Sequence, residues 1–255
     1  MSIVQQKSNY TNKNILYLKN VSITEYDLKS GGFNVIREFK LLPEDKIKLL
    51  ETYEKDKRNI VIGKIQAKSS KLSKEMVEGF GKARAKFVEL NRIPDENILS
   101  IKKDALFLIN CNNIQGRVGE YLEFRMKNKY SSYMRLNNKE FYFSPFEDLE
   151  VKGLSDECKE KQKDYLLKDI NMFLNQNEKI PPEMLFNNLK KYRSNYLERK
   201  LPIETYRNLD TGVFNFGNFD LDDIDESFLT DLDISYNYIN YVLPMIQNFM
   251  KDIIR

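Results

Sequence analysis

Histidine is absent from this chain of 255 residues, and cysteine occurs only twice, at Cys111 and Cys158. The absence of histidine excludes Ser-His and Cys-His catalytic triads, His-ligated zinc and the usual general base. Two cysteines cannot complete a conventional structural zinc site, and we expect both to be free, reduced thiols of a cytosolic protein. Any catalysis must therefore depend on carboxylates, amines, hydroxyls and bound ions.

Long apolar segments are also missing. No run of about 18 apolar residues occurs, so the sequence predicts no membrane span. Residues 1–20 are polar and lack the apolar stretch of a signal peptide. With 41% apolar and 31% charged residues the chain can bury a core and stay soluble. We expect a cytoplasmic protein with one large domain or two small ones.

The pattern of apolar residues changes along the chain. Strand-like segments dominate its first part, at 14–26, 59–66, 98–101, 105–110 and 121–143. Helical spacing is clearest over 73–90, and Pro43 opens a second, charged helix over 44–57. Amphipathic helices are predicted later, over 157–176, 182–200 and 235–254. The sequence therefore predicts an α+β fold with a domain boundary near residue 150.

Two aspartates stand out from this pattern. Asp27 follows the first strand-like run, and Asp104 lies in a tight turn between the runs 98–101 and 105–110. Two carboxylates at the ends of neighbouring strands can hold a pair of divalent metal ions about 4 Å apart, as phosphoryl-transfer enzymes require. Taken alone, an aspartate that ends a strand is more often a turn former or a helix cap than a metal ligand.

Basic residues gather in two stretches, although the net charge is only +3. One stretch contains Arg117, Arg125, Lys127, Lys129, Arg135 and Lys139, and the other contains Lys190, Lys191, Arg193, Arg199 and Lys200. Such charge runs form either a solvated face or a contact surface for a nucleic-acid backbone, and both interpretations stay open.

The order of these motifs resembles the palm and thumb of a family B DNA polymerase. Asp27-Leu28-Lys29-Ser30, followed by Val35-Ile36, keeps the frame of the family's first motif, an Asp, two residues and Ser-Leu-Tyr-Pro-Ser-Ile. Lys102-Lys103-Asp104-Ala105 stands where the family has the hairpin Asp-Thr-Asp-Ser and keeps its second Asp. The helix predicted over 73–90 precedes this hairpin, as a palm helix does.

Three later segments continue the resemblance. Lys127-Asn128-Lys129-Tyr130 resembles the Lys-Lys-Arg-Tyr element that grips the primer-template duplex. Glu150-Val151-Lys152-Gly153-Leu154 resembles the Val-Lys-Gly segment that leads into the thumb, and residues 200–204 resemble a late thumb stretch. Five matches in the right order over about 180 residues are more specific than any one of them.

The resemblance implies a palm with an antiparallel sheet and packed helices over 1–150, with minimal fingers at about 37–71, and a helical thumb over 151–255. It implies template-directed nucleotidyl transfer by a two-metal mechanism, in which Asp27 and Asp104 hold two Mg²⁺ or Mn²⁺ ions. The partners would be a primer-template, nucleoside triphosphates and a protein chain that supplies the missing polymerase domains. A reduced chain of this type suggests a virus or mobile element, and hence the cytoplasm of a host cell.

Individual residues receive roles from the same resemblance. The turn Ser30-Gly31-Gly32 exposes backbone N–H groups that suit triphosphate oxygens. One of Lys57, Arg58 and Lys64 would supply the cation of the fingers. The residues expected to contact nucleic acid are Lys127, Lys129, Tyr130, Lys152, Lys190, Lys191 and Arg193.

Departures from the family pattern keep two alternatives open. Gly32 replaces the tyrosine that excludes the ribose 2′-hydroxyl, which also allows an RNA polymerase or primase. Lys102 replaces the first Asp of the hairpin, Asn128 replaces a Lys, and the fingers motif is not recognisable in 57–65. These changes allow a catalytically degenerate, polymerase-like subunit that binds nucleic acid or serves assembly.

Overall fold

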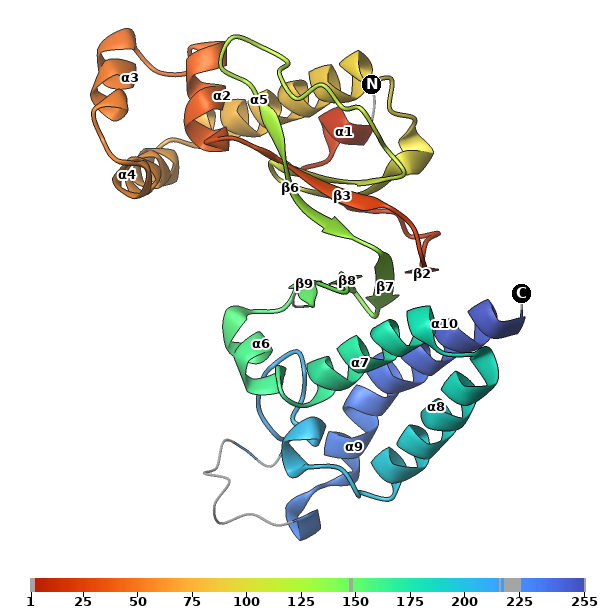
Figure 1. The fold of residues 1–255 in the computed structure, drawn as a ribbon. Helices are drawn as coiled ribbons and strands as arrows, with labels where there is room; N and C mark the ends of the chain where they lie inside the picture. Colours follow the sequence, from red (N-terminus) through yellow and green to blue (C-terminus); the bar gives the residue numbers. More distant parts are fainter. Residues whose placement is uncertain (1–2, 147–148, 216, 218–225, 255) are drawn as a thin grey trace. The chain divides into compact units, whose positions relative to one another are not determined.

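The computed structural model describes residues 3–146, 149–215, 217 and 226–254 (Figure 1). The chain forms two compact units, one comprising 1–14 and 22–129 and the other 15–21 and 130–255. Each unit combines a β-sheet with helices, which confirms the α+β class. The contacts divide the chain between Lys129 and Tyr130, whereas the sequence placed the boundary near residue 150.

The first unit is built on a five-stranded sheet. Across the sheet the strands are β1 (Asn9–Thr11), β4 (Ile98–Lys102), β5 (Ala105–Ile109), β3 (Ile23–Leu28) and β6 (Phe124–Tyr130). β1 pairs antiparallel with β4, β4 with β5, and β5 with β3, so the predicted hairpin of β4 and β5 is confirmed and occupies the centre.

Helices α1 (Ile3–Gln6), α2 (Gly31–Phe39), α3 (Glu44–Glu51), α4 (Lys55–Lys68) and α5 (Ser70–Leu90) complete the unit, with a short 3₁₀ turn at Asp95–Asn97. The helix predicted over 73–90 is confirmed as α5, whose N-cap Ser69 accepts a hydrogen bond from Leu72 N. Alternate residues of β3 form a core with α5, and the Tyr26 and Phe87 ring centroids lie 5.4 Å apart.

Two local predictions for this unit are wrong. The strand predicted over 59–66 lies within α4, and Ile62 is buried while Ile60 is 59% exposed. Residues two apart share one face of a strand, so this difference in burial is that of a helix. The break expected at Ser30-Gly31-Gly32 does follow the end of β3 at Leu28, and α2 then begins at Gly31, a helix that the sequence did not predict. The helix predicted over 44–57 is divided between α3 and α4.

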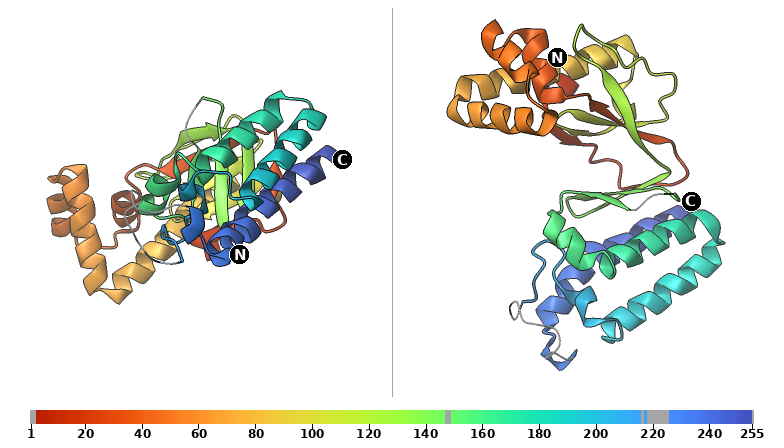
Figure 2. Two further views of the ribbon diagram at one scale, coloured as in Figure 1. Left: turned by 90° about the horizontal axis from the view of Figure 1, so that it is seen from below. Right: turned by 60° about the vertical axis from the view of Figure 1, so that its left-hand side comes forward.

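The second unit contains a four-stranded sheet in the order β2 (Tyr17–Leu18), β7 (Ser132–Leu136), β8 (Lys139–Phe143) and β9 (Glu150–Lys152). Its helices are α6 (Asp156–Gln162), α7 (Leu166–Lys179), α8 (Pro182–Leu197), α9 (Asp231–Asn237) and α10 (Leu243–Ile254), with a π-helical turn at Tyr238–Val242 and 3₁₀ turns at Ile203–Tyr206 and Glu226–Phe228. Figure 2 shows α7, α8 and α10 packed beside one another. Among the described residues, no helix is both long enough and apolar enough to cross a membrane.

Two buried amide side chains fasten the segment after α8 to the helices of this unit. Asn237 Nδ2 donates to the carbonyl oxygens of Thr205 at 3.2 Å and Arg207 at 2.8 Å, and its Oδ1 accepts from Leu209 N at 3.0 Å. Gln162 Nε2 donates to the same Arg207 carbonyl at 2.9 Å. Each bond satisfies a backbone group that burial would otherwise leave unpaired.

We expect Asn237→Ala to lower the free energy of unfolding by about 2–4 kcal/mol, because three buried hydrogen bonds are lost and their backbone partners stay desolvated. Asn187→Ala on the exposed side of α8 is the matched control and should change stability by less than about 0.5 kcal/mol. Urea unfolding monitored by circular dichroism measures both, and equal midpoints for the two variants would contradict the role given to Asn237.

Candidate active site

The pairing of β3 with β5 brings Asp27 and Asp104 together. Asp27 lies opposite Ala105 in the register of these strands, and Asp104 is the residue before Ala105. The amide of Leu28 also donates to the Asp104 carbonyl oxygen at 3.2 Å. The two aspartates, which are far apart in the sequence, are therefore neighbours at one end of the adjacent strands β3 and β5. Asp27 lies inside β3, one residue before its end.

Burial and charge make this pair of carboxyl groups easier to protonate. Burial is the largest cause that raises the pKa of Asp27, and the negative charge of Asp104 raises it further. The pKa of Asp104 is also raised, chiefly by burial, while Lys103, Lys127 and Arg84 act in the opposite direction. A cation placed beside the pair would favour the ionised form of both groups.

Glu25 adds a third carboxylate to the same side of β3, two residues before Asp27. It is 1% exposed, with Lys127 Nζ 3.3 Å from its Oε1 and Asn128 Nδ2 donating to its Oε2 at 3.0 Å. The carboxylate of Glu25 is thus engaged by β6. Within the described part of the chain, no group of three or more acidic, cysteine or histidine side chains is arranged to hold a metal ion.

The start of α2 lies against the Asp104 side chain. A Cβ atom on Gly31 would come within 2.9 Å of Asp104 Oδ2 and 3.1 Å of the Phe80 ring. Ser30, the residue before the helix, has a left-handed backbone with φ of 48°. Only glycine therefore lets the first turn of α2 approach the carboxylate so closely.

A pocket of about 400 Å³ opens beside Asp104. It is lined by Ser8, Asn9, Gly32, Asn59, Ile62, Gly63, Gln66, Ser73, Met76, Val77, Phe80, Arg84, Lys103 and Asp104. Its four α4 residues recur at intervals of three and four, which places them on one helix face. These α4 residues and Arg84 were missed from the sequence, and the apolar residues of 55–68 show too little helical periodicity to have revealed the α4 face.

The residues predicted to bind a nucleotide divide into two groups. Gly32 lines the pocket and Gly31 contacts Asp104, with Ser30 preceding them. The three predicted finger cations are not among the residues that line it. Arg58 lies over the Phe33 ring at 4.4 Å, Lys57 lies over the Tyr53 ring at 4.6 Å, and Lys64 is exposed. Arg84 and Lys103 are the cationic side chains in the pocket lining as described.

The residues predicted to contact nucleic acid lie in both units. In the first unit, Lys127 and Lys129 are exposed on β6. In the second, Lys190, Lys191 and Arg193 are exposed on α8, and Arg193 Nε donates to the Tyr238 hydroxyl at 2.8 Å. The shared groove that the sequence suggested for these residues stays a prediction.

Two further members of this set have protein partners. Tyr130 is 4% exposed, and its ring centroid lies 5.2 Å from that of Tyr142, which is the packing of a core residue and not of a stacking platform for bases. Lys152 on β9 forms an ion pair with Glu150 at 2.8 Å. Tyr130 is therefore removed from the candidate nucleic-acid surface.

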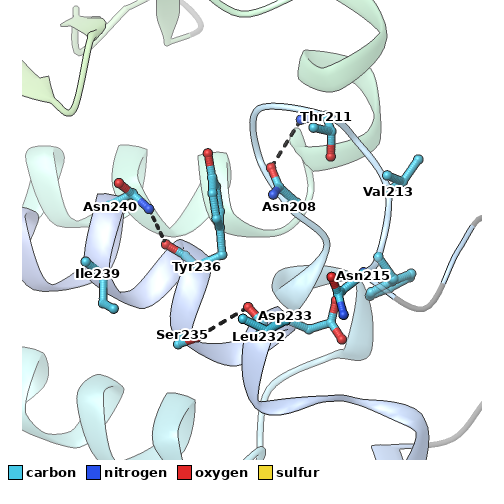
Figure 3. A pocket seen from close by; sticks show the side chains of 11 residues that line it. Asn208, Thr211, Val213, Asn215, Leu232, Asp233, Ser235, Tyr236, Ile239 and Asn240 are labelled. Atoms are coloured by element: carbon cyan, nitrogen blue, oxygen red, sulfur yellow. Dashed lines mark hydrogen bonds between the residues drawn. The ribbon is translucent and has the colours of Figure 1, made fainter.

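A second pocket, of about 480 Å³, lies in the second unit (Figure 3). Several polar groups around it bond to one another. Asn208 Oδ1 accepts from the amides of Asp210 and Thr211, and Asn240 Nδ2 donates to the Tyr236 carbonyl oxygen at 2.9 Å. Asp233 accepts from Thr230 in the capping box of α9. These bonds serve the local fold, and we assign no ligand to this pocket.

We expect Gly31→Ala to destabilise the first unit by about 1–3 kcal/mol, because the new methyl group displaces Asp104 or Phe80. Gly63→Ala is the matched control, since a Cβ there meets nothing within 4 Å. Alanine inside exposed α4 should stabilise it by roughly 0.5–1 kcal/mol. Thermal unfolding separates the two outcomes, and a stabilising Gly31→Ala would show that Asp104 is not confined by α2.

Comparison with protein-family models matches residues 1–251 to a family described as Bacteriophage PBS1 gene 130 protein. A comparison with curated proteins gave no match. The family description names a phage, in agreement with the viral origin expected from the sequence, but it names no activity. Because the match covers almost the entire chain, the chain belongs to the Bacteriophage PBS1 gene 130 protein family.

Proposed function

We propose that this chain catalyses template-directed nucleotidyl transfer, as the palm and thumb part of a DNA polymerase that acts with a partner chain in the infected host cell. The observation that carries the proposal is that Asp27, near the end of β3, and Asp104, in the β4–β5 turn, are neighbours, with a pocket beside Asp104. Their order in the chain and the helix before the β4–β5 hairpin agree with the resemblance to family B polymerases.

The donor set at this position suits Mg²⁺ or Mn²⁺. Magnesium is commonly held by one or two carboxylates together with substrate phosphate oxygens, so Asp27 and Asp104 suffice as the protein ligands. Burial and the charge of Asp104 raise the pKa of Asp27, and a divalent cation would favour ionisation there. Bound ions of this kind stabilise developing charge on the transferred phosphoryl group and lower the pKa of the attacking hydroxyl.

The pocket beside Asp104 has the size and polarity for a nucleoside triphosphate. Its volume of about 400 Å³ falls in the range of small-molecule sites. In this proposal Asn59 and Gln66 offer amide groups from α4, and Lys103 offers positive charge next to Asp104. The first N–H groups of α2, at Gly31 and Gly32, are oriented for phosphate oxygens as at other helix N-termini.

Two alternatives keep specific support. A polymerase-like subunit without catalysis is favoured by the finding that, among the described residues, no group of three or more side chains is arranged to hold a metal ion. An RNA polymerase or primase is favoured by Gly32, where a Cβ would meet only Met76 Cε, at 3.6 Å. Parallel assays with deoxyribonucleotides and ribonucleotides distinguish the latter.

We expect Asp27→Asn and Asp104→Asn each to weaken Mn²⁺ binding and to reduce primer extension at least about a hundredfold, because an amide cannot carry the ligand charge. Asp95→Asn, an exposed change in the same unit, is the control and should leave both unchanged. Electron paramagnetic resonance of Mn²⁺ and extension of a primed template are measured on the same preparations. If the parent protein does not bind Mn²⁺, the result favours the non-catalytic subunit.

We expect Arg125→Ala combined with Lys129→Ala to flatten the slope of log affinity for duplex DNA against log salt by about 1.8, since each phosphate contact contributes about 0.9. Lys127 is left in place because its removal would leave Glu25 buried without its ion pair. Lys46→Ala combined with Lys74→Ala serves as the control of equal charge. If the two double variants bind alike, β6 has no special role in contacting the backbone.

A further inference from the structure

A buried arginine, Arg84, lies behind the turn that carries Asp104. Arg84 belongs to α5 and is 1% exposed. Its Nε donates to the Val4 carbonyl oxygen at 2.9 Å, its Nη2 to that of Lys7 at 2.9 Å, and its Nη1 to that of Lys103. The guanidinium group thus bonds to three backbone carbonyls, so its burial is compensated by hydrogen bonds.

These three carbonyls belong to two separate parts of the unit. Val4 lies in α1 and Lys7 directly follows it, whereas Lys103 occupies the β4–β5 turn with a left-handed φ of 52°. A second bond joins the same parts, since Lys103 N donates to the Ser8 carbonyl oxygen at 2.8 Å. The N-terminal segment and the turn are therefore held in place from the helix behind them.

We propose that Arg84 is a positioning residue for Asp104: by bonding to the Lys103 carbonyl and to the N-terminal segment, its guanidinium fixes the turn that presents the Asp104 carboxylate. The catalytic meaning of this inference rests on the proposed function. A side chain needed only for packing would be apolar, because an apolar residue of similar volume packs a helix without the desolvation cost of a charge.

Electrostatics agree with this role. Burial lowers the pKa of Arg84 to about 10, and the negative charge of Asp104 limits the decrease, so the guanidinium stays charged at neutral pH. The positive charge of Arg84 lowers the pKa of Asp104 and so counteracts part of the increase that burial causes. With Gly31 on its other side, the Asp104 carboxylate is held by α2 and by the turn.

The test compares Arg84→Lys with the control Lys82→Gln on the same helix. Lysine keeps the charge but cannot donate to three separated carbonyls. Amide hydrogen exchange is followed at Lys103 and Leu28, which donate to the Ser8 and Asp104 carbonyls, and at Thr24 and Leu108 as reference positions deeper in the sheet. We expect exchange at least about tenfold faster at the first two amides in Arg84→Lys, with the reference amides nearly unchanged.

A uniform increase at all four amides would overturn the inference, because it indicates general loss of stability. If Arg84→Lys does not fold, Arg84→Gln replaces it, since a neutral amide has less desolvation cost. If neither variant folds, amide hydrogen exchange at Lys103 and Leu28 of the parent protein tests the inference. Local opening at Lys103 and Leu28 well below the free energy of global unfolding would contradict a turn fixed by Arg84.

A second readout links the turn to the proposed chemistry. Arg84→Lys should weaken Mn²⁺ binding and lower kcat about tenfold or more, since the Asp104 carboxylate is no longer held in position. Because Arg84 also lines the pocket, Mn²⁺ binding measured without nucleotide is the readout that reports on Asp104 alone. Loss of metal binding in Asp104→Asn but not in Arg84→Lys would overturn the inference and leave the proposed function standing. Unchanged metal binding and extension in Asp104→Asn would remove the proposed function, while the exchange experiment would still test the turn.

Discussion

The pairing of β3 with β5 is the constraint on which the candidate site depends. It sets Asp27 opposite Ala105, and thereby beside Asp104. The register is fixed from the other face of the sheet, where Tyr26 and Leu28 pack into the core with α5. A slip of one residue would turn those apolar side chains away from the helix and move Asp27 to the covered face. The core packing and the position of Asp27 thus both follow from the alternation of β3 side chains between the two faces of the sheet.

The negative charge of Asp27 and its acidic neighbours has to be balanced by the rest of the unit. Glu25 and Asp27 lie two residues apart on β3, and Asp104 adds a carboxylate from the adjacent turn. β6 supplies Lys127, which pairs with Glu25 and also opposes the raised pKa of both aspartates. Lys127 is already paired with Glu25. An added cation would therefore stabilise the ionised forms of Asp27 and Asp104 more than that of Glu25.

Segments with a clear apolar periodicity were assigned to the correct helix or strands. The weak periodicity of α4 led to a wrong prediction there, so the pocket residues of α4 were missed. The β4–β5 hairpin and α5 follow from uninterrupted apolar patterns, so both aspartates could be located. In α4, by contrast, the spacing of Ile60, Ile62 and Ile65 is compatible with a strand as well as a helix. The tertiary contact of Ile62 with the core decides between them. Asn59 and Gln66, which share its helix face, were missed for the same reason.

Arg84 was missed, although helical spacing places it on the same face of α5 as Phe80 and Val88. Its charge and the nearby Lys82 and Lys86 suggested an exposed side chain, and the fold shows that Arg84 is buried while these two lysines are exposed. Tyr130 is the opposite case, because a basic, aromatic-rich segment indicated a surface contact and the fold places its ring against Tyr142. Side-chain orientation within a strand or helix depends on which face is covered, and this is a property of the tertiary structure.

Several features that lower stability lie together around the Asp104 carboxylate. A glycine at the start of α2 and a buried guanidinium in α5 are each less stabilising than an alanine or an apolar side chain at an unconstrained position. Lys103 adds a left-handed backbone in the turn between them. All three adjoin Asp104. Such costs gather at functional sites, where geometry is held at the expense of stability. A chain that only bound nucleic acid through its basic surface would have no physical need for this arrangement, and it is the reason for preferring the catalytic proposal.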